Sequence, residues 1–158
     1  TAHVTPSPDL ESRAADQEET GPGRSVRVLH IGKFFPPDPG GMETFLADLV
    51  AAQHRKGICA AVLVHGEPRP DDPPDGIHLH LPINSAFWAL SLAGARRIPW
   101  IVHWHSDVLV TDARNALSRA YTLYRPFEQA ILKRAQRVIA TSPDYLAASE
   151  PLSHWREK

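Results

Sequence analysis

Short apolar segments alternate with helix-like segments along most of this chain, and this alternation limits the fold more than any other feature. Five segments are rich in β-branched and aromatic residues and are typical of strands: residues 26–31, 59–65, 77–81, 100–105 and 137–142. They are apolar almost throughout, as strands buried on both faces of a parallel sheet usually are. The alternation therefore predicts an α/β domain with a mostly parallel sheet and helices on both faces.

The segments between the strands have helical patterns. Apolar residues from Met42 to Val50 recur at spacings of three and four, which predicts a helix that ends at Gly57. Residues 85–97 are predicted to form a second helix. Apolar positions between residues 117 and 132 predict a long third helix that bends near Pro126, and a short helix is expected after residue 142.

Composition divides the chain and excludes several classes of protein. Residues 1–24 are polar and contain no aromatic residue, so we predict a disordered tail followed by one domain over residues 25–158. The net charge of −1 gives no electrostatic basis for binding nucleic acid. Cys59 is the single cysteine, which excludes an internal disulfide and a multi-cysteine metal site and fits a reducing compartment. There is no apolar run of the roughly 20 residues that a membrane span needs, nor an N-terminal signal core.

The loop GKFFPPDPGGMETF, residues 32–45, joins the first strand to the first helix. Ligands of open α/β sheets bind beyond the carboxyl ends of the strands. Gly40 and Gly41 lie at the helix start, where backbone N–H groups lack helical partners and the helix dipole is positive. Glycines there leave room for a phosphate or carboxylate. The alternative is that Pro-Gly-Gly forms only a turn, and the chemistry alone leaves the two interpretations about even.

Histidines gather in two strands. His78 and His80 alternate in one strand and His103 and His105 in the next, so each pair points to one side of the sheet. For His78 and His103 we favour buried, hydrogen-bonded histidines without a chemical role. His105 lies at the carboxyl end of its strand, which favours a role as a general acid or base or in orienting a substrate. A metal site is disfavoured because Asp107 is the one carboxylate nearby.

Four stretches, in order, resemble the N-terminal domain of family 4 glycosyltransferases: RVLHIGKFFPPDPGGMETFLADL, IHLHLPINSAFWALSLA, WIVHWHSDV and LYRPFEQAILKRAQRVIATSPDYLAASEPL. The resemblance covers roughly residues 26–158. It implies one half of a GT-B enzyme, in which two Rossmann-like domains face each other across a cleft. It further implies transfer of a sugar from a nucleotide-sugar donor, with retention of configuration, no cofactor and no required metal. The acceptor would be a glycan, a lipid-linked molecule or a small molecule.

The resemblance also suggests roles for individual residues. Gly40 and Gly41 match the family's glycine pair, whose amides approach the donor phosphates, and His105 matches a histidine near the transferred sugar. Lys33 and Glu43 flank the glycine loop, and Asp107 and Ser142 follow neighbouring strands; all four are expected to contact acceptor or substrate. Four aromatic residues are candidates for stacking on an acceptor: Phe34, Phe35, Trp88 and Trp104. For Trp88, core packing is the favoured alternative.

Two departures from the family pattern stand out. The C-terminal donor domain is not in the sequence, so we expect this chain to be inactive by itself. The link over residues 66–76 is rich in proline and has no helical pattern, where the family usually has another strand and helix. We therefore predict an irregular loop there, and strands at 59–65 and 77–81 that are not adjacent partners. Other readings stay open: a non-catalytic remnant that binds sugar or nucleotide, or a His/Asp metallohydrolase. The family implies a cytoplasmic location with peripheral contact at the inner face of the membrane.

Overall fold

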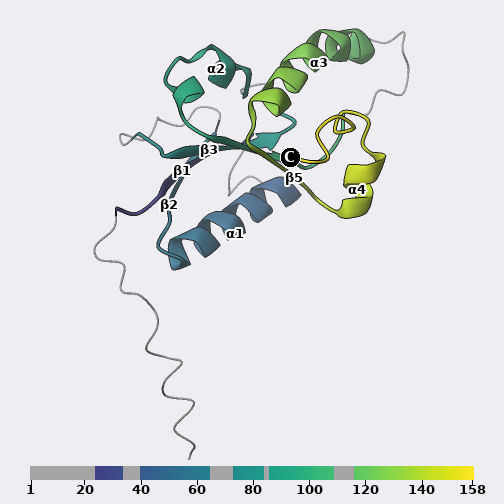
Figure 1. Cartoon of the computed structure of the whole chain (residues 1–158). Coiled ribbons are helices and arrows are strands. Elements are labelled where there is room, and N and C mark those ends of the chain that lie inside the picture. Colours follow the sequence, from purple (N-terminus) through teal and green to yellow (C-terminus); the bar gives the residue numbers. More distant parts are fainter. Residues whose placement is uncertain (1–23, 34–39, 65–72, 84–85, 109–115) are drawn as a thin grey trace, which may run out of the picture.

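The computed structural model describes residues 24–33, 40–64, 73–83, 86–108 and 116–158 (Figure 1). In chain order its elements are β1 (Arg27–Ile31), α1 (Gly41–Arg55), β2 (Cys59–Leu63), β3 (Gly76–Leu81), α2 (Ala86–Ser91), the 3₁₀ turn η1 (Ala95–Arg97), β4 (Trp100–Trp104), α3 (Ala116–Arg134), β5 (Arg137–Ala140) and α4 (Pro143–Ala148). We predicted a disordered tail over residues 1–24, of which residues 1–23 lie outside the described residues.

The five strands form one sheet in the order β2-β1-β3-β4-β5, and every pairing is parallel. The predicted α/β, Rossmann-like fold is therefore confirmed. β2 and β3 both pair with β1 and do not pair with each other, as predicted from the link between them. Of that link, residues 65–72 lie outside the described part, so its predicted irregular conformation stays a prediction there.

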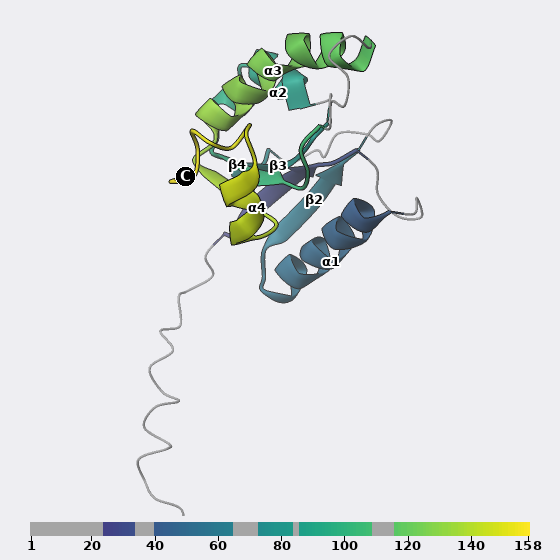
Figure 2. The ribbon, with the colours of Figure 1, turned by 90° about the vertical axis from the view of Figure 1, so that its right-hand side faces the viewer.

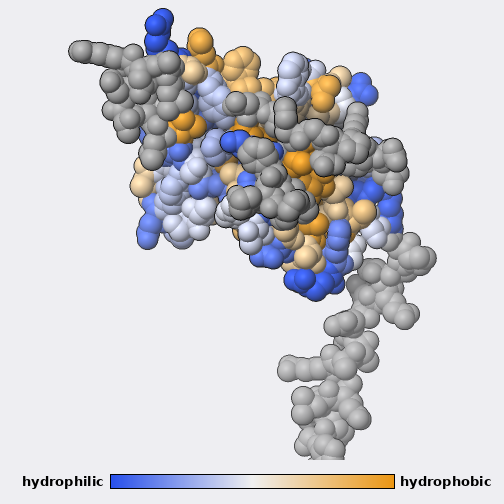
Figure 3. All heavy atoms as spheres, turned by 180° about the vertical axis from the view of Figure 1, so that it is seen from behind, coloured by the Kyte–Doolittle hydropathy of each residue, from blue (hydrophilic) through white to orange (hydrophobic). Residues whose placement is uncertain are grey.

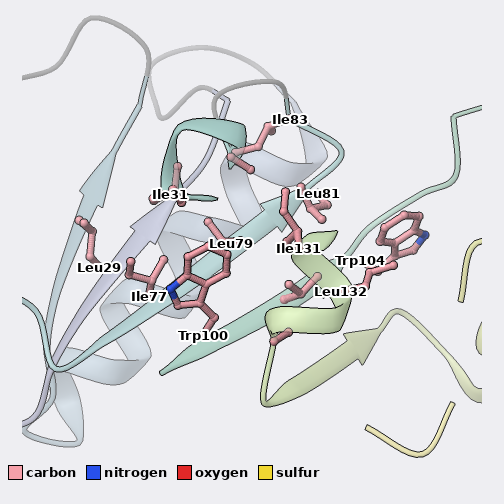
Figure 4. Packing of buried hydrophobic residues seen from close by; sticks show 14 of the residues in the cluster. Leu29, Ile31, Ile77, Leu79, Leu81, Ile83, Trp100, Trp104, Ile131 and Leu132 are labelled. Atoms are coloured by element: carbon pink, nitrogen blue, oxygen red, sulfur yellow. The ribbon is translucent and has the colours of Figure 1, made fainter. Parts of the chain in front are cut away.

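One face of the sheet is apolar. Alternate residues of the strands point to it, among them Leu29, Leu79 and Trp100, and α2 and α3 cover it with residues such as Ile131 (Figure 4). Figures 1 and 2 both show α2 and α3 on one side of the sheet and α1 on the other. The fully buried side chains of this core include Leu79, Trp100 and Trp104. This layer carries most of the apolar burial of the described residues.

The helices differ in part from their predicted bounds. The single helix predicted over residues 85–97 is two pieces, α2 and η1, because the chain turns at residues 93 and 94 between them. Pro126 lies inside α3, which continues as one helix across it. None of the helices in the described part is long and apolar enough to cross a membrane.

Apolar side chains also reach the surface. A cavity of about 440 Å³ lies between β1, β2, β3 and α2, and its walls are mostly apolar, with Leu29, Leu63 and Ala89 among them. The view from behind shows apolar residues gathered in patches within an otherwise hydrophilic surface (Figure 3). Trp88 borders the cavity and is 72% exposed, so the favoured core-packing interpretation of this residue is wrong.

Candidate functional site

The face of the sheet toward α1 carries five histidines, and they lie opposite the apolar core. His30 belongs to β1, His78 and His80 to β3, and His103 to β4; His105 directly follows β4. The register pairs His30 with His78 and His80 with His103, so the alternation within each strand brings all five side chains to one face.

Three of these imidazoles form a hydrogen-bonded chain that begins on α1. Nε2 of His30 lies 2.7 Å from Oε1 of Gln53, and Nδ1 of His30 lies 3.0 Å from Nε2 of His80. Nδ1 of His80 in turn lies 3.0 Å from Nε2 of His105. A continuous polar path therefore runs from the last turn of α1 across the sheet to the carboxyl end of β4. We call Gln53, His30, His80 and His105 the imidazole chain.

The other two histidines stack against this chain. The ring centroids of His103 and His105 lie 4.3 Å apart with an angle of 8° between the ring planes. Those of His78 and His80 lie 4.6 Å apart with an angle of 25° between the planes. Phe45 of α1 meets His103 and His105 edge-on. His78 and His103 are buried as expected, but Nε2 of His78 and Nδ1 of His103 have no hydrogen-bond partner among the described residues. The prediction that these two histidines are hydrogen-bonded is thus not met at those atoms.

Burial keeps these histidines neutral. It lowers the pKa of His78 to about 3 and that of His80 to about 2, and the other histidines of the cluster lower both further. The pKa of His103 falls to about 4, again mainly through burial and then through His105. Burial also lowers the pKa of His30 and of His105; for His105 the Glu43 carboxylate opposes this effect. At neutral pH each ring therefore has one N–H and one lone pair.

The start of α1 lies beside His105. Glu43, in the first turn of α1, is buried and interacts electrostatically with His105. A Cβ atom placed on Gly40 would lie 2.0 Å from Oε2 of Glu43, so the carboxylate occupies the space above this glycine. Gly41 has nothing within 4 Å of the corresponding position. The helix start thus faces an internal anion at Gly40 and open space at Gly41.

Two further predicted site residues, Asp107 and Ser142, form hydrogen bonds within the domain. Oδ1 of Asp107 accepts hydrogen bonds from Trp104 Nε1 at 2.7 Å, and from Tyr145 Oη and Ser149 Oγ at 2.8 Å each. Ser142 caps α4, because its Oγ accepts a hydrogen bond from Tyr145 N at 3.1 Å. These contacts join the end of β4 to α4.

Lys33 and the aromatic candidates have different positions. Lys33 is exposed two residues after β1. Trp104 is fully buried in the core, so its interpretation as a stacking surface for an acceptor is wrong. Phe34 and Phe35 lie outside the described residues. The roles predicted for Lys33, Glu43, Asp107, Ser142 and the glycines as substrate contacts stay predictions.

Two triads offer one ligand atom per residue within 4.8 Å of one another: His30, His78 and His80, and His80, His103 and His105. A set of imidazoles alone suits zinc, copper or nickel. Each triad contains a pair of rings stacked face to face, and His80 uses both its nitrogens in hydrogen bonds. Asp107 belongs to neither group, so the described geometry gives no His/Asp site of the kind that a metallohydrolase would need.

Sequence reasoning missed His30, Gln53 and Phe45. His30 lies in the predicted first strand, and its parity relative to Leu29 and Ile31 is the signal that places it opposite the apolar face. Gln53 and Phe45 are eight residues apart on α1 and their role depends on how that helix lies across the sheet. Strand pairing and helix packing, which are tertiary properties, therefore determine the cluster.

Comparison with known proteins identifies the family of this chain. The model of the glycosyl transferase 4-like domain matches residues 2–153. The chain belongs to the glycosyl transferase 4-like family. This match begins within residues 1–24 and so includes the stretch that we predicted to be a disordered tail. No solved structure matches this glycosyl transferase 4-like domain.

Two curated proteins are similar to this glycosyl transferase 4-like domain. O-antigen chain mannosyltransferase C of Escherichia coli is 24% identical over 170 residues, which cover 84% of this chain and 44% of the relative. D-rhamnosyltransferase WbpZ of Pseudomonas aeruginosa is 27% identical over 169 residues, covering 84% of this chain and 43% of the relative. The chain thus spans less than half the length of either relative.

Proposed function

We propose that this domain forms the acceptor side of a glycosyltransferase that moves a sugar from a nucleotide-sugar donor to an acceptor, with retention of configuration. The acceptor is a glycan, a lipid-linked molecule or a small molecule. The family match over residues 2–153 carries this proposal, and both similar proteins are named as sugar transferases. The complete enzyme would add a second Rossmann-like domain that binds the nucleotide, in the manner of GT-B enzymes.

Several residues at the carboxyl edge of the sheet support this proposal. A neutral, half-buried His105 and the positive end of α1 lie together at the carboxyl edge of the sheet, where ligands of such sheets bind. We propose that His105 contacts the transferred sugar, that Gly40 and Gly41 present backbone N–H groups to the donor phosphates, and that Lys33 and Glu43 contact hydroxyl groups. The open space at Gly41 and the internal carboxylate at Gly40 support a larger part for Gly41.

Further parts of the proposal concern conditions and place. We propose that the transfer needs no cofactor or metal ion, because the helix N-terminus can itself stabilise negative charge on the donor. The enzyme would work in the cytoplasm, with peripheral contact to the inner face of the membrane when the acceptor is lipid-linked. Asp107 and Ser142 would then act mainly through the position of α4, with which they form hydrogen bonds.

The test is a screen of nucleotide-sugars and acceptors on the complete gene product. His105→Ala should lower turnover by ~10²-fold or more, since it removes a group at the reacting centre. Gly41→Val should weaken donor binding, because a branched side chain would fill the open space at the helix start. His154→Ala, which alters an exposed histidine outside the cluster, is the matched control. Unchanged kinetics in both site variants would contradict the proposed roles, and binding without transfer by the complete protein would favour a non-catalytic binding protein.

We also propose that the 158-residue chain does not transfer sugar alone. Holding donor and acceptor together can lower a barrier by ~7–11 kcal/mol, and this chain spans less than half the length of its two similar proteins. Nucleotide-sugar binding should be on the order of millimolar, or ~4 kcal/mol. Calorimetry and a product assay on this chain check both points. Micromolar binding, or turnover above the buffer control, would overturn them.

A further inference from the structure

The imidazole chain has a defined direction. Its first member, Oε1 of Gln53, is a carbonyl oxygen and can only accept a hydrogen bond, so Nε2 of His30 must carry the proton in their 2.7 Å contact. A neutral imidazole has a single N–H, and Nδ1 of His30 is therefore a bare acceptor. The 3.0 Å contact to His80 then needs the proton on Nε2 of His80.

The same rule applies at the next link. Because His80 carries its proton on Nε2, its Nδ1 is an acceptor, and the 3.0 Å contact to His105 needs the proton on Nε2 of His105. All three rings then have the same tautomer. Nδ1 of His105 is left with a lone pair, and no hydrogen-bond partner for it is found among the described residues.

We propose that Gln53, acting through His30 and His80, sets the tautomer of His105, so that Nδ1 of His105 is presented as a hydrogen-bond acceptor for a sugar hydroxyl group. Gln53, His30 and His80 are positioning residues, and His105 is the group that meets the substrate. This inference rests on the proposed function for its ligand, whereas the tautomers themselves do not depend on it.

The burial of the chain makes this control effective. His30 and His80 are fully buried, so a nitrogen without a partner would have no water to replace it. Reversing one ring would place two N–H groups, or two lone pairs, against each other at 3.0 Å. The three rings must therefore change together, and the polar group at the α1 end selects between the two directions.

A bound metal ion is the competing explanation of the cluster. Coordination needs the lone pairs of three rings to converge on one point. Two pairs of rings are instead stacked, with interplanar angles of 8° for His103 and His105 and 25° for His78 and His80. The short N···N contacts are instead suited to N–H···N hydrogen bonds. The geometry therefore favours the proton-bearing chain over a metal site.

The decisive measurement is nitrogen NMR on the 158-residue chain labelled at histidine. We expect His30, His80 and His105 each to carry the proton on Nε2, with scalar couplings across both N–H···N hydrogen bonds. A proton on Nδ1 of any of the three rings, or the absence of the couplings, would overturn the proposal. Zn²⁺ is added as the metal probe. Loss of the Nε2–H signals at micromolar Zn²⁺ would assign the cluster to a metal instead.

A pair of variants tests the part played by Gln53. Gln53→Glu keeps an acceptor at the end of the chain and should keep the Nε2–H tautomer of His105. Gln53→Lys replaces the acceptor by a donor and should move the proton of His105 to Nδ1, two rings away. A purely structural role for Gln53 would not reverse a distant tautomer. An unchanged tautomer at His105 in Gln53→Lys would refute control by this residue.

The complete enzyme separates this inference from the proposed function. If Gln53→Lys reverses the tautomer and also raises the KM for the sugar donor at least tenfold relative to Gln53→Glu, both stand. If the tautomer reverses and transfer is unchanged, the imidazole chain stands and the role of His105 in sugar binding fails. If the wild-type chain has mixed tautomers while His105→Ala still abolishes transfer, the function stands and the chain fails.

Discussion

Acidification should unfold this domain through its buried histidines. Histidine has an ordinary pKa of 6.5, whereas the folded-state pKa is about 3 for His78, about 2 for His80 and about 4 for His103, mainly because of burial. Below pH 6.5 the unfolded chain therefore binds protons that the folded chain does not. The stability that these residues contribute is fully present above pH 6.5 and is lost as the pH falls below it.

The magnitude follows from linkage. Between pH 7.5 and 5.5 each such histidine should cost about 1.4 kcal/mol of unfolding free energy, since this span includes about one pH unit below the unfolded-state pKa. The three together should cost ~4 kcal/mol, a large part of the ~5–15 kcal/mol that stabilises a domain. This loss of stability requires only that the folded-state pKa values lie well below ~5.5, so it does not depend on how far below this pH they lie.

Urea unfolding at pH 7.5 and 5.5 measures this effect, with the buried Trp100 and Trp104 as fluorescent reporters. Single changes such as His103→Phe and His78→Phe should each reduce the loss between the two pH values by about 1.4 kcal/mol. Comparing variants cancels contributions from other groups. His154→Gln, at an exposed position outside the cluster, is the control variant. Equal pH dependence in the wild type and in both cluster variants would refute neutral, buried histidines.

Three further predictions concern α3 and the start of α1. Burial, followed by the nearby Asp107, raises the pKa of Glu128 to about 7, so its folded form holds a proton that the unfolded chain releases from about pH 4.5 upward. Stability should fall as pH rises through this window, and Glu128→Gln should stabilise the domain at pH 8 by ~2–3 kcal/mol in urea unfolding; no gain there would contradict a protonated Glu128. Gly41→Ala should stabilise α1 by ~0.5 kcal/mol, because the added Cβ meets nothing within 4 Å and alanine favours helices. Gly40→Ala should instead displace the Glu43 carboxylate and so lower the pKa of His105, seen by NMR titration; an unmoved titration would refute the contact.

Much of the architecture was predictable because it depends on local patterns. The β-branched segments predicted five strands, and the proline-rich link correctly predicted that β2 and β3 do not pair. Alternation in IHLHL and WIVHWH correctly placed His78 with His80 and His103 with His105 on one face. These properties follow from the two-residue period of a strand.

The site was only partly predictable because its contacts cross between elements. Asp107 and Ser142 follow strands, as expected for ligand contacts, yet α4 engages both in hydrogen bonds. Trp104 alternates with His103 and thus points to the apolar face, so its burial could have been inferred from parity. The contact of Gln53 with His30 could not have been inferred from the sequence, because it depends on how α1 lies across the sheet.

The two faces of the sheet should also differ in how they tolerate replacement over evolutionary time. On the apolar face, exchange of Leu79 or Val102 for another aliphatic residue of similar volume usually costs little, because the neighbours can repack. On the other face, His30 and His80 are fully buried between partners that need both a donor and an acceptor at fixed positions. No other side chain of that size offers both on one ring. A saturation mutagenesis scan should therefore return broad substitution profiles at Leu79 and Val102 and almost invariant positions at His30 and His80.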